Sequence, residues 1–406
     1  MATAQSDKGV GGLAGSRGAP PHRPHILLVE SSPNCDGGAQ VVLDELLHRV
    51  DRERFSVSFA CLADGTWADR VRAEGIPVYV VPQTRWRHVR NVWAVSSRLK
   101  EVIVRADVDC VHASESSTIL FASLAARRAK VPLVWMLFDP LRGSSPRRWL
   151  TARRKVSAWI LERFDPDWVI FGTAHVARGG PIRRSTPTTT ILPGIDVERY
   201  GKGDGRRARE QLGIPADAPL VVTLGRLTYL KSQLNFLRIV HQVASTYPDV
   251  AAVVCGSEGA VRYARMVRSL RSELGLDETV RITGFVSDQM RDDIVAAADV
   301  VVHLAKRESF GLAVVEGMAA GKAVVAADAT GPRSLIEDGR SGVLVPVDDD
   351  AAAVVAIDRL LSDPAERAAL GAAAAEVARQ HPVEGMVLAV EAVWDAVLAA
   401  DTSVRR

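Results

Sequence analysis

The sequence predicts an α/β protein of two domains, each built around a doubly wound parallel sheet. Short apolar runs that fit buried strands alternate along the chain with segments that fit helices, a pattern typical of βαβ units. With 406 residues, of which 47% are hydrophobic, the chain can fill two separate cores. A glycine-rich stretch at residues 201–205 interrupts the alternation and predicts where the first domain ends.

The first half contains the elements of one such sheet. Residues 1–23 are rich in Gly, Ala, Ser and Pro and lack the apolar core of a signal peptide, so we expect a disordered tail. The predicted strands are 25–29, 55–60, 77–81, 110–112, 132–138, 167–171 and 190–196. The predicted helices between them are 39–50, 67–74, 92–105 and 119–128.

The second half repeats the pattern. Its predicted strands are 219–224, 251–257, 280–286, 298–304, 321–327 and 342–346. Its predicted helices are 206–212, 232–245, 261–274, 290–298, 310–320, 351–361, 365–379 and 384–400, with a loop at 328–334. The predicted division is therefore a first domain at 24–200, a second domain at 201–382 and a terminal amphipathic helix at 383–406.

One strand–turn–helix unit of the second half carries two carboxylates at a fixed spacing. Glu308 lies in the turn after the strand, and Glu316 follows eight residues later inside the helix. Ligands of open α/β sheets bind at the carboxyl ends of the strands, and a helix N-terminus attracts anions. The two glutamates would then flank a phosphate site, where sugar hydroxyls could hydrogen-bond to them. Either glutamate alone would be an ordinary surface charge.

This segment, Glu308-Ser-Phe-Gly-Leu-Ala-Val-Val-Glu316, resembles the donor-site motif of the retaining GT-B glycosyltransferases of family GT4, the glycosyltransferase group 1 domain. The resemblance extends over about 25–347 and implies two Rossmann-like domains that face each other across a cleft. It implies that Glu308 contacts the transferred sugar and Glu316 the ribose of a nucleotide. The backbone of Ser309, Phe310, Gly311 and Leu312 would then meet the diphosphate.

Other positions match the same family. Arg226 and Lys231 follow a strand, where two cations five residues apart can clamp a diphosphate, and they match the family's Gly-Arg-x4-Lys motif. The resemblance places Gly37 and Gly38 under the diphosphate. It places the nucleotide base near Phe285 and Val286.

The chain also departs from the family pattern. Residues differ from the usual ones at Gln40, Phe138, Pro193, Ser232 and Ser334. Because Phe138 stands where many members have a histidine, His112 and Asp139 become candidates to face the reacting centre. A lone histidine at a strand end is more often structural than catalytic.

The resulting expectation is a retaining transferase that moves a sugar from a nucleotide sugar, with UDP- and GDP-sugars as the first candidates. Glu308, Arg226, Lys231, His112 and Asp139 are the candidate catalytic residues. The resemblance implies no bound metal and no cofactor. The alternatives are a nucleotide-sugar hydrolase or epimerase of the same fold, or a non-catalytic sugar-binding relative.

The remaining expectations concern partners and location. The basic segment 142–163, with interleaved Trp and Leu, could lie on an anionic membrane or be a solvated helix. The four cysteines form no C-x-x-C pair, which favours reduced thiols in a cytoplasmic protein. The net charge is only +3, and we expect no nucleic-acid partner.

Overall fold

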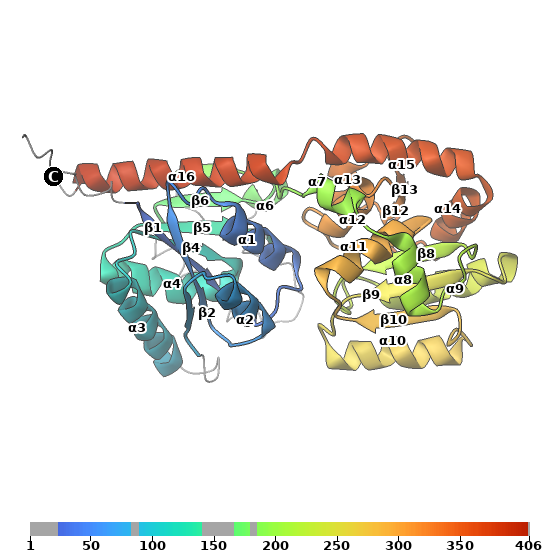
Figure 1. Cartoon of the computed structure of the whole chain (residues 1–406), viewed down its shortest axis with the longest axis horizontal. Coiled ribbons are helices and arrows are strands. Elements are labelled where there is room, and N and C mark those ends of the chain that lie inside the picture. Colours follow the sequence, from blue (N-terminus) through green and yellow to red (C-terminus); the bar gives the residue numbers. More distant parts are fainter. Residues whose placement is uncertain (1–22, 83–88, 140–165, 179–184, 405–406) are drawn as a thin grey trace, which may run out of the picture.

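The computed structural model describes residues 23–82, 89–139, 166–178 and 185–404. It contains two parallel sheets, one in each half of the chain, that lie side by side in the molecule (Figure 1). The predicted α/β class with two doubly wound parallel sheets is therefore confirmed. The basic segment 142–163 lies outside the described residues.

The first sheet has seven strands in the order β3-β2-β1-β4-β5-β6-β7, and every pair is parallel. Its order reverses between β1 and β4. The strands are β1 (His25–Glu30), β2 (Ser56–Cys61), β3 (Val78–Val80), β4 (Cys110–Ser114), β5 (Leu133–Leu137), β6 (Trp168–Phe171) and β7 (Thr188–Thr190).

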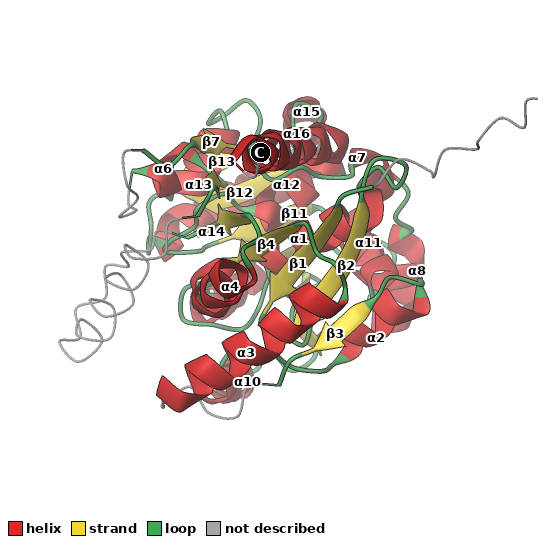
Figure 2. Cartoon of the chain, turned by 90° about the vertical axis from the view of Figure 1, so that its left-hand side faces the viewer, coloured by secondary structure: helices red, strands yellow, loops and turns green. Residues whose placement is uncertain are grey.

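Helices cover both faces of this sheet, so its central strands are apolar on both sides. Helices α3 (Val89–Arg105) and α4 (Glu115–Ala129) pack on one face (Figure 2). Helices α1 (Gly38–Arg49) and α2 (Thr66–Ala73) pack on the other. A short helix, α6 (Ala174–Ala177), follows β6.

The second sheet has six parallel strands in the order β10-β9-β8-β11-β12-β13. The strands are β8 (Leu220–Leu224), β9 (Ala251–Cys255), β10 (Val280–Gly284), β11 (Val300–His303), β12 (Ala323–Ala327) and β13 (Val343–Val345). The order reverses between β8 and β11. Such reversal points open a crevice at the carboxyl ends of the strands.

Helices again enclose this sheet. One face carries α8 (Gly205–Leu212), α11 (Asp288–Ala297), α12 (Leu312–Ala319) and α15 (Pro364–Ala378). The other carries α9 (Gln233–Thr246), α10 (Val261–Glu273) and α14 (Asp350–Ser362). Helix α12 is apolar nearly all round, and such helices lie inside a protein; here every residue from Ala313 to Ala319 is buried.

Two crossings connect the halves. The chain passes from β7 through α7 (Val197–Gly201) into the second half. It returns after α15 as α16 (Val383–Val404), which lies along the first domain (Figure 1). The apolar stripe of α16 packs on the α1 and α2 side of the first sheet, where Trp394 contacts Phe55 edge-on. None of the described helices is both long enough and apolar enough to cross a lipid bilayer.

Two local predictions were wrong. The expected strand at 190–196 is instead β7, which ends at Thr190, and Pro193 would break a sheet ladder because it lacks an N–H. The expected loop at 328–334 contains a short helix, α13 (Thr330–Leu335). This helix is fixed by a contact distant in sequence: the Gly331 N–H donates to the carbonyl of Glu308 over 2.9 Å.

Candidate functional site

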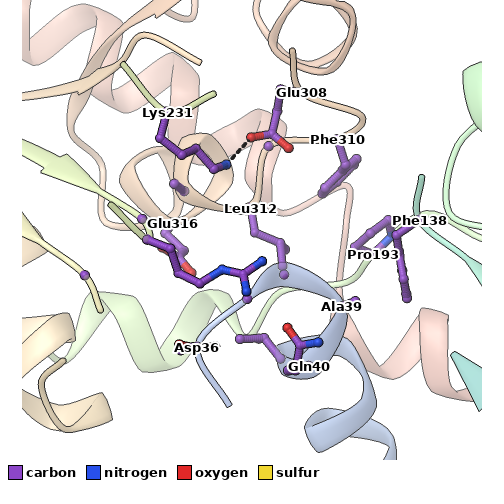
Figure 3. Close-up of a pocket in the computed structure, with 18 of the residues that line it drawn as sticks. Asp36, Ala39, Gln40, Phe138, Pro193, Lys231, Glu308, Phe310, Leu312 and Glu316 are labelled. Atoms are coloured by element: carbon purple, nitrogen blue, oxygen red, sulfur yellow. Dashed lines mark hydrogen bonds and ion pairs between the residues drawn. The ribbon is translucent and has the colours of Figure 1, made fainter. Parts of the chain in front are cut away.

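A cavity of about 480 Å³ lies between the carboxyl ends of the two sheets (Figure 3). The first domain contributes residues 35–41 after β1, 137–139 after β5, 172–173 after β6, and Pro193. The second contributes residues 225, 226, 228, 230 and 231 after β8, 255–257 at the end of β9, 285, 286, 288 and 291 around the start of α11, and 307–313 and 316 after β11. Every one of these segments follows or ends a strand, starts a helix or links the two, so the two sheets build the site together.

Glu308 lies on the second-domain side of the cavity, between a lysine and a histidine. Lys231 forms an ion pair with it (Figure 3), and the His303 Nε2 lies 3.0 Å from the Glu308 Oε2. Burial alone would raise the pKa of Glu308, but the His303 hydrogen bond and the Lys231 charge outweigh it and lower that pKa to about 2. Burial lowers the pKa of His303, so its ring is neutral at pH 7 and donates the Nε2 proton. Glu308 is therefore a fixed, ionised acceptor.

Glu316 lies deeper, in the middle of α12, with a side chain only 2% exposed. Arg291 from α11 donates through one nitrogen, Nη2, to both of its carboxylate oxygens, at 2.6 Å from Oε1. Both residues line the cavity. The pair thus presents an anchored carboxylate at the cavity wall.

The start of α12 provides backbone donors to the same cavity. Gly311 precedes the helix with a φ of +105°, a conformation that side chains disfavour. The first N–H groups of a helix have no acceptor within it and carry partial positive charge. The backbone at Gly311, Leu312 and Ala313 is thus suited to bind an anion.

Arg226 reaches across to the glycine-rich loop of the first domain. A Cβ atom at Gly37 would lie 3.2 Å from the Arg226 Nη2 and only 2.2 Å from the Gln40 Oε1. Glycine at this position leaves room for the guanidinium and for the side chain of Gln40. Arg226, Lys231 and the helix start thus place positive charge around one part of the cavity.

Hydrogen bonds between side chains of the two domains join the walls of the cleft. The Ser257 hydroxyl donates to Asp36 over 2.5 Å, and the Ser309 hydroxyl donates to Asp139 over 3.1 Å. Figure 3 shows Phe138 and Pro193 on one side of the cavity and Lys231 on the other. The first-domain wall therefore combines apolar rings with carboxylates.

The structure brings almost all of the sequence-predicted residues together. The residues that line the cavity are Gly37, Gly38, Asp139, Arg226, Lys231, Phe285, Val286, Glu308, Ser309, Phe310, Gly311, Leu312 and Glu316. His112 does not join them: it is fully buried and accepts a hydrogen bond from the Trp394 indole over 3.1 Å. Burial also lowers the pKa of His112 to about 3, so its position under α16 fits a structural role.

Sequence reasoning missed His303, Arg291, Asp36 and Ser257. His303 is the last residue of β11 and the last but one of the predicted strand 298–304, at the edge where ligands bind, so its position alone was a usable signal. Asp36 directly precedes Gly37 and Gly38, which the resemblance places under the diphosphate. Nothing in the sequence separates Arg291 from other helix-surface arginines.

Ser232, which departs from the family pattern, occupies a strained position beside Lys231. Its φ is +58° and its hydroxyl is buried. No described residue forms a hydrogen bond with that hydroxyl. Ser232→Gly is expected to raise the free energy of unfolding by roughly 1 kcal/mol, because glycine adopts this conformation without steric cost. Chemical denaturation measures this free energy. Ser269→Gly is the control: Ser269 lies inside α10, where glycine should lower the stability. A loss of stability in Ser232→Gly would contradict the assignment of strain.

Comparison with known families decides the classification. Residues 36–199 match the family model described as "Glycosyltransferase Family 4", and residues 204–377 match the one described as "Glycosyl transferases group 1". The chain belongs to the family 4 glycosyltransferases. The first range includes β2 to β7 of the first sheet, and the second range includes all six strands of the second sheet together with the donor-site motif.

Several curated relatives of this family 4 glycosyltransferase are named D-inositol 3-phosphate glycosyltransferase. The chain is 35% identical over 194 residues to D-inositol 3-phosphate glycosyltransferase 2 of Catenulispora acidiphila, covering 46% of this chain and 45% of that one. It therefore spans about half the length of the curated relatives that it matches at such identities. A second protein of that organism, D-inositol 3-phosphate glycosyltransferase 1, is 28% identical over 89% of this chain and 93% of its own.

Solved structures share the fold. HepE of Anabaena in complex with UDP-glucose has a TM-score of 0.79 and 24% identity, covering 92% of this chain and 99% of that one. Sucrose-phosphate synthase from Thermosynechococcus elongatus has a TM-score of 0.75 and 18% identity, covering 93% and 100%. At these identities the likeness concerns the fold alone, and this fold is GT-B.

Proposed function

We propose that this protein transfers a sugar from a nucleoside diphosphate sugar to an acceptor hydroxyl, with retention of configuration at the anomeric carbon. One arrangement carries the proposal: an ionised Glu308, two cations and a helix N-terminus converge on a single interdomain cavity. The charge that develops on the leaving diphosphate needs such preorganised donors. Family membership supports the same reaction.

Each group has a separate task in this proposal. Arg226, Lys231 and the backbone at the start of α12 bind the diphosphate. Glu308 accepts hydrogen bonds from the sugar, and Glu316 accepts them from the ribose. Asp139 faces the sugar from the first domain, and the base lies near Phe285 and Val286. No residue is assigned as the base that removes the acceptor proton, because the leaving phosphate can take it.

The relatives suggest which donors and acceptors to test first. UDP-glucose is bound to HepE, which makes UDP-sugars the first donors to test, followed by GDP-, ADP- and dTDP-sugars. The curated relatives are named for D-inositol 3-phosphate, which makes inositol phosphates the first acceptors to test. A thermal-shift panel selects the donor, since a ligand that binds only the folded protein raises its melting temperature.

The reaction itself is tested by the release of free nucleoside diphosphate. Release that requires the acceptor, with an α-linked product from an α-linked donor, is the expected result. Release without acceptor would indicate a hydrolase, and binding without release would indicate a sugar-binding relative. We expect activity to survive EDTA, since the proposal uses no bound metal and no cofactor.

The proposal also includes a location. A cytoplasmic protein that touches an anionic membrane through 142–163 would co-float with anionic liposomes at low salt. The absence of co-flotation would remove this part and leave the transfer reaction untouched.

A further inference from the structure

The partner of Glu316 is the feature that the proposed reaction leaves unexplained. Arg291 comes from α11, whose first turn is held by the Ser287 hydroxyl, which accepts from the Met290 N–H. Its guanidinium uses one nitrogen for both oxygens of Glu316. The buried Nε has no acceptor among the described residues. A buried donor without a partner costs free energy, so packing alone does not explain this placement.

We propose that Arg291 is a positioning residue that holds the Glu316 carboxylate in one orientation for the 2′- and 3′-hydroxyls of the donor ribose. This inference rests on the proposed function. It makes Arg291 a determinant of the preference for ribonucleoside over 2′-deoxyribonucleoside donors.

The hydrogen-bonding capacity of the carboxylate supports this role. An ionised carboxylate only accepts, and its two oxygens offer about four lone-pair sites. Arg291 occupies one site on each oxygen, which leaves one site on each for a pair of neighbouring hydroxyls. A protonated Glu316 would lose acceptor capacity and present a proton instead.

The surroundings of Glu316 make Arg291 necessary. Burial alone would lower the pKa of Arg291, but the charge of Glu316 outweighs it and raises that pKa. Removing this cation would leave a buried carboxylate without its ion-pair partner, which is costly. Among the described residues, Tyr200 from α7, Cys255 from β9, Asp292 from α11 and His303 from β11 also interact with Glu316. None of these four is a cation at neutral pH, so none replaces Arg291.

The test compares nucleoside diphosphates that differ only in the 2′-hydroxyl. Calorimetric titration of the full-length protein with UDP and with 2′-deoxy-UDP gives a ratio of dissociation constants. Because both ligands carry the same diphosphate, its contribution to binding cancels in this ratio. The GDP and ADP pairs are measured in the same way, and the pair whose ribonucleotide binds is used.

In the wild type, the ribonucleotide is expected to bind about tenfold or more tightly than its 2′-deoxy analogue. Arg291→Met is expected to reduce the ratio to about threefold or less, because the carboxylate loses the partner that orients it. Arg291→Lys keeps a cation beside Glu316 and should keep most of the ratio.

Arg207→Met is the matched control. Arg207 makes a similar two-point pair with Asp293 on the same helix, α11, with a distance of 2.7 Å between Nη2 and Oδ1, and neither residue lines the cavity. Its loss should leave the ratio unchanged. Both variants are compared with the wild type by melting temperature, so a general loss of structure is recognised.

The outcomes separate this inference from the proposed function. If no ribonucleoside diphosphate binds the wild type, the proposed function fails and this inference fails with it. If the wild type discriminates and Arg291→Met keeps the full ratio, the inference alone is overturned. A ratio in Arg291→Lys as low as that in Arg291→Met, or an equal loss in Arg207→Met, would also overturn it.

Discussion

Glu308→Gln is expected to lower kcat/KM for sugar transfer by about a thousandfold while the protein stays folded. The replacement keeps the shape of the side chain but removes the charge that Lys231 and His303 hold in place. Removing one preorganised electrostatic group from an active site costs about a hundred- to a thousandfold in rate. Here the loss also frees Lys231 from its partner, so we expect the upper end of that range.

Initial-rate kinetics measure this loss, with the donor selected by the thermal-shift panel and the acceptor that supports release of nucleoside diphosphate. Glu337→Gln, measured in the same way, is the control. Glu337 is exposed and pairs only with the neighbouring Arg340 among the described contacts, so its change should leave kcat/KM within twofold. Turnover of Glu308→Gln within tenfold of the wild type would remove Glu308 from the catalytic site.

The lowered pKa of Glu308 gives this experiment a second readout. The folded-state pKa of about 2 lies below the ordinary value of 4.5, so the ionised form stabilises the fold. That contribution is complete above about pH 4.5 and is lost as the pH falls through about 2. The stability difference between wild type and Glu308→Gln should therefore be constant from pH 7 to 5 and shrink below pH 4. A difference that is still undiminished near pH 2 would contradict this assignment.

Arg226→Ala is expected to weaken donor binding by about a hundredfold. Its guanidinium lies against Gly37, and no described residue accepts a hydrogen bond from it, so its donors are available to a diphosphate. Hydrogen bonds to charged groups contribute about 1.5–3 kcal/mol each, so losing a two-point contact accounts for that factor. Calorimetry with the nucleoside diphosphate measures it.

Arg238→Ala is the control for Arg226→Ala, because Arg238 is an exposed arginine of α9 outside the cavity. Arg226 is a cleaner test than Lys231, whose removal would also release Glu308. Unchanged affinity for both the diphosphate and its sugar ester in Arg226→Ala would rule out the proposed clamp.

The fold and the centre of the site could be predicted because their signals are local. The strand before Glu308 and the helix after it are continuous apolar runs with one turn between them, so the two glutamates could be placed from spacing alone. The turn at Arg226 and Lys231 follows a strand in the same way. Parallel order then brings these turns to one edge.

The parts that were missed depend on contacts between distant segments. Arg291 meets Glu316 only because α11 and α12 pack on the same face of the sheet. Helix α13 forms where Gly331 closes on the Glu308 turn; a Cβ there would lie 2.3 Å from the Phe310 carbonyl oxygen. The burial of His112 depends on α16, which follows it by more than 270 residues.

The return of the chain as α16 has a consequence for motion. The two connections meet where the Ile195 N–H donates to the His381 carbonyl over 2.8 Å and the Val383 N–H donates back to Ile195 over 3.2 Å. A Cβ at Gly194 would lie only 2.5 Å from the Val383 Cα, so the two segments are in tight contact. Because both connections pass this shared point, any rotation about it that separates the two lobes would have to break the Ser257–Asp36 and Ser309–Asp139 hydrogen bonds across the cleft.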